Sequence, residues 1–292
     1  MIMKRRIIDI LSAFFQAIDT LLCKCQIKSP KVIVYLDGGI CSQMLMYLHD
    51  QYYAEQGFDV RYDTRWYETC GKDQFGNMPR YFEFKEMWPK LEMTTISNWQ
   101  RKWYLLFFKA KRTKENWLPE PTSVKHSMYL YEYWNIPADD HRRLFAKCYN
   151  LSESSAPAIG KLMDFEGVVG VHVRRGDLAK GDNPYYGGVS EGYFLRAIEL
   201  CNKEFKPKKY LFFSDEPDWV EQNICNHITQ PYEIMRGNKA WEDLWLLAHC
   251  PIIVASQGSF GKVAARLNQE SVLIQCDNEH ANHARKNTYL IK

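Results

Sequence analysis

The sequence predicts an α/β protein of two lobes, each built on a parallel sheet. From Ser29-Pro30 onward, short apolar strands alternate with helical stretches, a pattern that implies βαβ units with helices on both faces of the sheet. The chain has 292 residues, about twice the usual length of one domain. Its most linker-like stretch is 152–158, Ser-Glu-Ser-Ser-Ala-Pro-Ala. We therefore predict one α/β lobe over residues 29–155 and a second over 156–292.

The composition excludes several classes of protein. Hydrophobic residues make up 46% and charged residues 25%, which are ordinary globular values and exclude a disordered or low-complexity chain. A formal net charge of +3 argues against a dedicated duplex-DNA binder, so no nucleic-acid partner is expected. Nine cysteines show neither a CxxC pair nor zinc spacing, which fits a reduced, cytoplasmic chain.

Residues 1–28 predict an N-terminal amphipathic helix. A basic start, Lys4-Arg5-Arg6, precedes apolar positions that are interrupted by polar ones. No span of about 18 uncharged apolar residues is long enough to cross a membrane, and no cleavage site of a signal peptide is clear. Two interpretations stay open. The helix lies on a membrane surface, at the inner face, or it packs on the globular body.

In the first lobe, the strand Val32–Leu36 ends in Asp37-Gly38-Gly39, and a helical pattern follows. Residues 58–62 alternate as a second strand. In the second lobe the alternation of strands and helices is clearer. The predicted strands are 168–173, 210–213, 252–255 and 272–275, and the predicted helices lie around 190–204, 217–225, 240–249 and 260–267. Ligands of such sheets bind outside the carboxyl ends of the strands, so the strand ends are where functional residues are expected.

The strand at 168–173 ends in a cluster of charged residues. If the strand persists, His172 and Arg174 point to one face and Arg175 to the other. Gly176 then permits a turn, and Asp177 is placed to pair with Arg175. A guanidinium at a strand's carboxyl end suits a bidentate grip on phosphate oxygens, which predicts an anion site. The alternative is that both arginines make structural ion pairs.

A second candidate follows the strand at 252–255. Gly258 and Ser259 begin a helix whose backbone N–H groups and dipole favour an anion, although serine at this position is commonly only a cap. Upstream, Glu242 and Asp243 open another helix. Either one favours the helix dipole there, and Asp243 alternatively accepts hydrogen bonds from the N–H edge of a guanine.

The loop after the first strand, beginning Asp37-Gly38-Gly39, lets the backbone approach a ligand closely. It is neither GxGxxG nor a P-loop, so no dinucleotide or ATP fingerprint is present. The sequence has no HExxH, no DxD suited to a nucleotide–metal bridge and no GxSxG. Metal-independent chemistry is therefore predicted, with no cofactor and no metal site.

These residues resemble a known family. The run His172–Asp177 resembles the HxRRxD motif shared by α-1,2-, α-1,6- and protein O-fucosyltransferases. Three further segments resemble the α-1,2-fucosyltransferases of glycosyltransferase family 11: Gly38–Met44 resembles GGLGNQM, Phe212–Trp219 resembles FSDD…W, and Asp243–Asn268 resembles DLxLMSxCKHxIxANSSFSWWAAWLN. The landmarks occur in order across roughly residues 32–275.

The resemblance implies a GT-B type fold of two Rossmann-like lobes, with GDP-fucose held mainly by the C-terminal lobe. It also implies an inverting, metal-independent transfer of L-fucose to a sugar hydroxyl, with an α-1,2 linkage to galactose in a bacterial-type surface polysaccharide or oligosaccharide. Arg174 would hold the β-phosphate and offset charge on the departing GDP. Arg175 and Asp177 belong to the same expected GDP-fucose-binding set, with Arg175 as a structural partner of Asp177. His172 and Asp243 would address the guanosine end. The diphosphate would be cradled by Gly258, Ser259 and the N–H of Phe260.

The sequence also departs from the family pattern. Cys41-Ser42 replaces Gly-Asn, Gln257-Gly258 replaces Asn-Ser, and Lys262-Val263 replaces a Trp pair. These departures from the family pattern bear more on the expected acceptor linkage than on the expected donor, GDP-fucose. The acceptor-side residues carried over are Gly38, Gly39, Ser42 and Gln43. No general base is marked by the family motifs, and Asp37 is the nearest candidate.

Aromatic residues form 14% of the chain, and most Trp and Tyr lie in the first half, where they pack in the core or stack on sugar rings of an acceptor. The basic and aromatic stretch 99–112, with the N-terminal helix, predicts contact with an anionic membrane that carries a lipid-linked glycan. Rival hypotheses are a fucosyltransferase of another linkage, a transferase of another GDP-sugar such as GDP-mannose, a non-catalytic glycan- or nucleotide-binding protein, and RNA binding.

Overall fold

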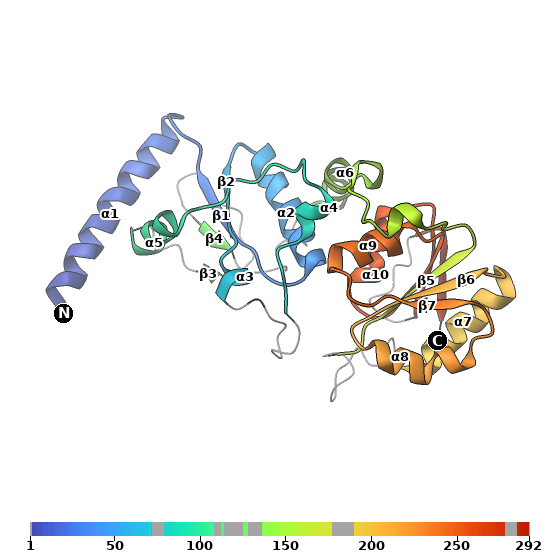
Figure 1. Cartoon of the computed structure of the whole chain (residues 1–292). Coiled ribbons are helices and arrows are strands. Elements are labelled where there is room, and N and C mark those ends of the chain that lie inside the picture. The colour runs from blue at the N-terminus through green and yellow to red at the C-terminus, as the bar shows by residue number, and fades with distance from the viewer. Residues whose placement is uncertain are drawn as a thin grey trace. The chain divides into compact units, whose positions relative to one another are not determined.

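The computed structural model (Figure 1) describes residues 2–69, 71, 79–107, 112–113, 125–127, 136–176, 190–277 and 285–291. The chain forms two compact units. Unit 1 comprises Met1–Lys85 and Lys90–Tyr149, and unit 2 comprises Glu86–Pro89 and Asn150–Lys292. After the short excursion at Glu86–Pro89, the chain passes into unit 2 for its remaining length at Asn150, close to the linker-like stretch. The boundary after residue 155 stays a prediction. So do the predicted roles of the two lobes, which are the acceptor side for the first and GDP-sugar binding for the second.

Unit 1 contains a four-stranded parallel sheet with strand order β2-β1-β4-β3. Its strands are β1 (Lys31–Tyr35), β2 (Asp59–Asp63), β3 (Arg112–Thr113) and β4 (Lys125–Ser127). Its helices are α1 (Ile2–Lys24), α2 (Ile40–Glu55), α3 (Trp66–Thr69), α4 (Phe84–Met87, shared with unit 2), α5 (Asn98–Phe107) and α6 (Ala138–Cys148). The apolar run Val32–Tyr35 is buried, as expected for a central parallel strand covered on both faces.

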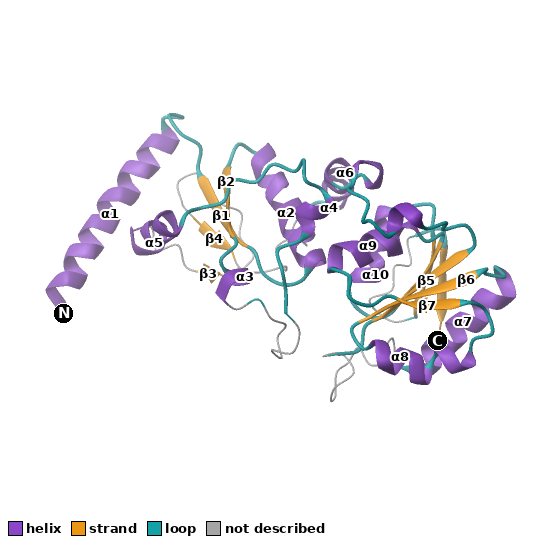
Figure 2. Cartoon of the chain, viewed as in Figure 1, coloured by secondary structure: helices purple, strands orange, loops and turns teal. Residues whose placement is uncertain are grey.

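Unit 2 contains a six-stranded parallel sheet with strand order β10-β9-β8-β5-β6-β7. Figure 2 shows these strands with the helices around them. The strands are β5 (Val168–Val173), β6 (Lys209–Ser214), β7 (Tyr232–Ile234), β8 (Ile252–Ala255), β9 (Val272–Cys276) and β10 (Thr288–Ile291). The helices are α7 (Glu191–Glu204), α8 (Pro217–Asn223), α9 (Ala240–His249) and α10 (Phe260–Leu267), and short 3-10 turns are η2 (Leu151–Glu153), η3 (Gly160–Leu162) and η5 (Cys225–His227).

Helices cover both faces of the unit 2 sheet. Val169, Val171 and Val173 of β5 pack in one buried cluster with Tyr193 of α7 and Val220 of α8. The alternate residue of β5, Gly170, faces α9 instead, since a Cβ there would lie 2.6 Å from Cδ1 of Leu247. The sheet is thus a doubly wound parallel sheet. The predicted fold class, α/β with two lobes on parallel sheets, is confirmed.

The strand order reverses at the centre of the unit 2 sheet. From β5 the chain adds β6 and β7 on one side, and it then returns to add β8, β9 and β10 on the other. This is the strand order of doubly wound nucleotide-binding sheets, in which ligands bind outside the carboxyl ends of the two strands that flank the reversal. Here those strands are β5 and β8, which pair in parallel from Val169↔Ile252 to His172↔Ala255.

The predicted N-terminal helix is present as α1, and one of its faces packs within unit 1. The Ser12 hydroxyl donates to the Phe107 carbonyl at 2.6 Å, and the Gln16 amide donates to the same carbonyl at 3.2 Å. The Phe15 ring lies 5.1 Å from that of Trp103. The interpretation of a packed helix therefore holds for this face. Among the described residues, no helix is long and apolar enough to cross a membrane.

Candidate functional site

The carboxyl ends of β5 and β8 gather several residues predicted from the sequence. β5 ends at Val173, and Arg174 and Arg175 follow it outside the strand, so the alternation expected for a continuing strand stops there. β8 ends at Ala255, and the turn 256–259 leads into α10. Because the two strands are neighbours in parallel, both turns lie at the same edge of the sheet, at the point where the strand order reverses.

Ser256 ties these two strand ends together. Its hydroxyl oxygen accepts a hydrogen bond from the Arg174 backbone N–H at 2.9 Å and lies 3.1 Å from Nδ1 of His172. Its own N–H donates to the His172 carbonyl at 3.1 Å. The side chain is buried. Sequence reasoning passed over Ser256, and the only signal for it was a small polar residue directly after a buried strand.

His172 is a buried, neutral imidazole. Its ring stacks on that of Phe260 at the start of α10, with centroids 5.0 Å apart and planes inclined by 25°. Burial, with the Arg174 charge as a further cause, lowers the pKa of His172 to about 3. A neutral imidazole has one N–H donor and one acceptor nitrogen, so its pattern toward a ligand is set by the tautomer. Contact with the guanosine end stays a prediction.

Arg174 is held by Asp215, a residue that follows β6. Its Nη1 pairs with Oδ2 of Asp215, while Oδ1 of the same carboxylate accepts the Arg175 backbone N–H at 2.9 Å. Both side chains are largely buried. A guanidinium presents its N–H donors in a fixed fork, so pairing with a carboxylate sets the orientation of the group. Asp215 is thus a positioning residue that sequence reasoning did not single out.

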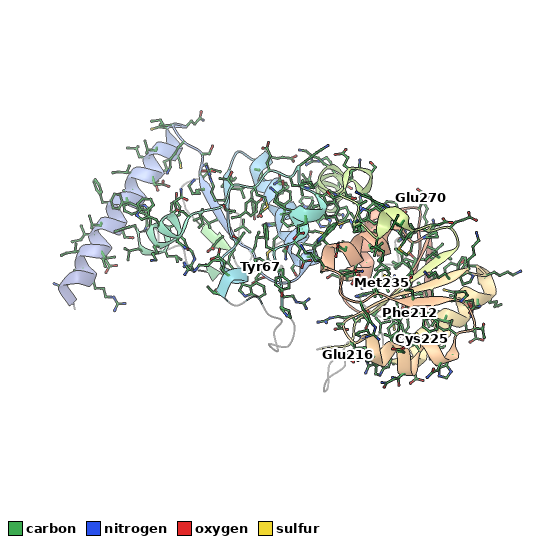
Figure 3. All side chains as sticks on the ribbon, in the orientation of Figure 1. Tyr67, Phe212, Glu216, Cys225, Met235 and Glu270 are labelled. Carbon is green, nitrogen blue, oxygen red and sulfur yellow. The ribbon has the colours of Figure 1, made fainter. Side chains whose placement is uncertain are left out.

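Arg175 points to a different set of partners. Its Nε donates to Oε2 of Glu216 at 3.2 Å, and its guanidinium carbon lies 3.6 Å from the centre of the Trp219 ring. Glu216, labelled in Figure 3, is the residue before α8. Such stacking and pairing support a structural role for Arg175. The predicted partner, Asp177, lies outside the described residues.

The amino end of α10 presents backbone to solvent beside these residues. Gly258 has φ +107, a conformation that favours glycine, and it is exposed. Ser259 is the N-cap and makes no side-chain capping bond, so its hydroxyl does not satisfy the first N–H groups of the helix. Gly261 lets α10 approach the sheet, because a Cβ there would lie 2.6 Å from Cβ of Ala255. The geometry suits the predicted anion cradle of Gly258, Ser259 and the Phe260 N–H.

Asp243 and Glu242 lie in the first turn of α9. Glu242 accepts the Lys239 backbone N–H at 2.8 Å as part of a capping box, so this residue caps the helix. Asp243 Oδ1 accepts from the Asn238 side-chain amide at 2.8 Å. Glu242 therefore stabilises the start of the helix, as the first of the two interpretations predicts. Contact between Asp243 and a guanine stays a prediction.

In unit 1, the loop after β1 contains the acceptor-side residues. Gly38 has φ +74, and a Cβ there would meet the Ser42 hydroxyl at 2.7 Å, so the loop requires glycine. Gly39 is the N-cap of α2. The Gly38 carbonyl accepts from the hydroxyl of Tyr67, which comes from α3 and is labelled in Figure 3, at 3.2 Å. Burial raises the pKa of Asp37 to about 6.

Gln43 is fully buried and serves the backbone of the same loop region. Its amide nitrogen donates to the Tyr81 carbonyl at 2.7 Å, and its oxygen accepts the N–H groups of Glu83 at 3.0 Å and Phe84 at 3.2 Å. These bonds fix the segment before α4 against α2. Contact of Gln43 with an acceptor stays a prediction. In the described part of the chain no group of three or more His, Cys, Asp or Glu side chains is placed to hold a metal ion.

The fold is a doubly wound α/β fold, and Arg174, His172 and the amino end of α10 gather where its strand order reverses. The family model of glycosyl transferase family 11 matches residues 94–292, well over half of the sequence. The chain therefore belongs to glycosyl transferase family 11, and the resemblance read from the motifs is confirmed. Two α/β units with parallel sheets are what the GT-B type expected for this family requires. No curated protein matches the sequence.

Several solved structures are similar to this chain at low identity. POFUT1 in complex with GDP is 10% identical with a TM-score of 0.44, over 90% of this chain and 98% of that chain. POFUT1 in complex with GDP-fucose is 9% identical with a TM-score of 0.42, over 90% and 97%. The E. coli heptosyltransferase WaaC with ADP-2-deoxy-2-fluoro heptose is 13% identical with a TM-score of 0.41, over 90% and 93%. These similarities are distant, and family membership rests on the sequence match.

Proposed function

We propose that this chain is an inverting fucosyltransferase that transfers L-fucose from GDP-fucose to a hydroxyl of a glycan acceptor. The proposed linkage is α-1,2 to galactose, in a bacterial-type surface polysaccharide or oligosaccharide. The proposed acceptors include glycans that are linked to a lipid. The observation that carries the proposal is the grouping of Arg174, His172 and the amino end of α10 at the reversal of the unit 2 sheet. Membership of family 11 supports it.

The donor diphosphate is assigned to the basic edge of unit 2. Arg174 binds the β-phosphate, and the exposed turn at Gly258 and Ser259 with the Phe260 N–H receives the other phosphate oxygens. The ion pair with Asp215 orients the guanidinium before the donor arrives, which lowers the entropic cost of binding. The guanosine is assigned to His172 and Asp243.

Breaking the bond between fucose and GDP leaves negative charge on the β-phosphate. A fixed positive charge and oriented N–H groups at that position stabilise the transition state, and this electrostatic contribution is commonly the largest in such reactions. Arg174 and the first turn of α10 supply both. The proposed mechanism assigns this charge stabilisation to Arg174 and the helix and includes no metal and no cofactor.

Asp37 is the proposed general base for the acceptor hydroxyl. Because burial raises its pKa to about 6, the carboxylate is ionised at neutral pH and basic enough to take a proton. We expect kcat/KM to rise with pH, by about tenfold per pH unit below pH 6, and to level off above it. Asp37→Asn should lose about a hundredfold or more in kcat and lose this acidic limb. Measuring pH profiles of both proteins checks the assignment, and an Asn variant with the parent's kcat and pH profile would remove Asp37 from the mechanism.

The linkage and the metal requirement are tested together. The purified full-length chain is incubated with GDP-fucose and galactose-terminated acceptors in the presence of a chelator, and the products are analysed for linkage. We expect fucosylated product with an α-1,2 linkage and an undiminished rate under chelation. Another linkage corrects the acceptor assignment, and loss of activity on chelation contradicts the metal-independent mechanism. GDP-fucose binding without turnover on any acceptor would favour the non-catalytic alternative.

A further inference from the structure

The outer face of α1 is an apolar stripe that unit 1 leaves uncovered among the described residues. Large apolar side chains recur along it at helical spacing and are exposed, Ile10 by 70%, Phe14 by 57% and Leu21 by 61%. The full stripe is Ile7, Ile10, Leu11, Phe14, Ile18 and Leu21. At 3.6 residues per turn these positions fall within an arc of roughly 100°. Contiguous exposed apolar surface of this kind marks a binding face.

The opposite face of α1 is the one that packs in unit 1. Ser12 and Asp19 are buried, Phe15 contacts Trp103, and Ser12 bonds to the Phe107 carbonyl of α5. Asp19 pairs with Lys28. The helix is therefore held in place through one face while its stripe points to solvent. None of the stripe belongs to the buried core that the described residues of unit 1 form.

Basic residues border this stripe. Arg6 precedes Ile10 by one turn, and Lys24 follows Leu21 by one turn, so both side chains emerge along its edge. Arg5, Arg6 and Lys24 are exposed, and Lys4 precedes them in the sequence. The exposed acid of the helix is Asp9, since Asp19 is buried in its pair with Lys28. An apolar stripe edged by cations complements a surface that is apolar below and anionic above.

We propose that α1 lies in the interface of an anionic lipid membrane, with its stripe in the acyl region and its basic residues at the headgroups. Amphipathic helices with a basic polar face and large apolar side chains on the other bind in this way, to a depth of about 5–10 Å. The cations favour this occupant over a second copy of the chain, because an anionic lipid surface supplies the opposite charge at both ends of the helix, where the basic residues lie. The inference goes beyond sugar transfer and does not depend on the donor.

The test is flotation of the full-length chain with vesicles of phosphatidylcholine alone or mixed with phosphatidylglycerol. We expect binding to the mixed vesicles and at least about fivefold weaker binding to the neutral ones. Ile10→Ser with Phe14→Ser should weaken partition to mixed vesicles by at least about tenfold. Arg6→Ala with Lys24→Ala should lose about tenfold on mixed vesicles and little on neutral ones.

Ala13→Ser is the matched control, because Ala13 is exposed on α1 outside the stripe. It should bind as the parent does. All of these positions are exposed, so the thermal midpoint should not change, and the same samples can be checked for fold. The proposal is overturned if the parent fails to bind mixed vesicles, or if the double serine variant binds them equally well. A dimer that depends on Ile10 and Phe14, in a parent that ignores vesicles, would assign the stripe to a second copy instead.

Discussion

Replacing Arg174 by alanine is expected to lower kcat for fucosyl transfer by at least about a hundredfold. In the proposed mechanism this guanidinium meets the charge that develops on the departing GDP. Its removal takes away a transition-state contact that water in the same place does not replace, because water is not held in a fixed orientation. Transfer from GDP-fucose at the parent rate in this variant would contradict the assignment of the donor site.

The variant also leaves the Asp215 carboxylate without its guanidinium partner, which destabilises a buried pair. Arg174→Lys separates the two effects, since it keeps a positive charge beside Asp215 and loses the planar fork. We expect it to fold as the parent does and still lose about tenfold or more in kcat. Arg236→Ala is the matched control. Arg236 is exposed and pairs with Asp218 and Glu221, so its loss should leave kcat unchanged.

Gly261→Ala is expected to destabilise unit 2 by about 1–3 kcal/mol, because an added Cβ has no room. It would lie 2.6 Å from Cβ and 3.1 Å from Cα of Ala255, and a backbone atom of a central strand yields little. The helix α10 must then move from the sheet, which also displaces Ser259 and the ring of Phe260 from His172. We therefore expect a lower unfolding midpoint in denaturant together with weaker binding of GDP.

Gly192→Ala provides a matched control, since Gly192 is likewise the second residue of a helix, α7. A Cβ there meets only the end of the flexible Arg196 side chain, at 3.2 Å. Replacing glycine within a helix by alanine then stabilises by up to about 1 kcal/mol. Equal unfolding midpoints for the two variants would show that the contact between α10 and β8 is not tight and would contradict this packing.

Much of unit 2 could be predicted from the sequence, for a physical reason. The runs Val168–Val173 and Ile252–Ala255 are buried and, apart from His172, apolar, as strands covered on both faces require, and both were predicted with the bounds found. The short strands β7 and β10 were missed. They form the edges of the sheet and expose part of their side chains. Tyr232–Ile234 has a glutamate at its centre, and the apolar run of Thr288–Ile291 is only three residues long, so neither stands out as a buried strand.

Those residues of the site that follow directly from the order of parallel strands could be predicted from the sequence. Parallel strands place their carboxyl ends together, so His172, Arg174 and Ser259 were expected at one edge, and the structure brings their strand ends side by side. Asp215 lies in the segment Phe212–Trp219, which resembles a family motif, but neither it nor Ser256 was given a role, because each acts through a neighbouring strand. The register of β5 against β6 and β8 decides that Asp215 meets Arg174 and that Ser256 meets His172. No local pattern in the sequence encodes such pairings.

The most direct test of the proposed function is the choice of donor. The purified full-length chain is supplied in turn with GDP-fucose, GDP-mannose and a UDP-sugar, each with a galactose-terminated acceptor, and released nucleoside diphosphate is measured. We predict acceptor-dependent release of GDP from GDP-fucose and little release from the other two, and loss of that release in Arg174→Ala. Turnover of GDP-mannose or of the UDP-sugar in preference to GDP-fucose would contradict fucosyl transfer.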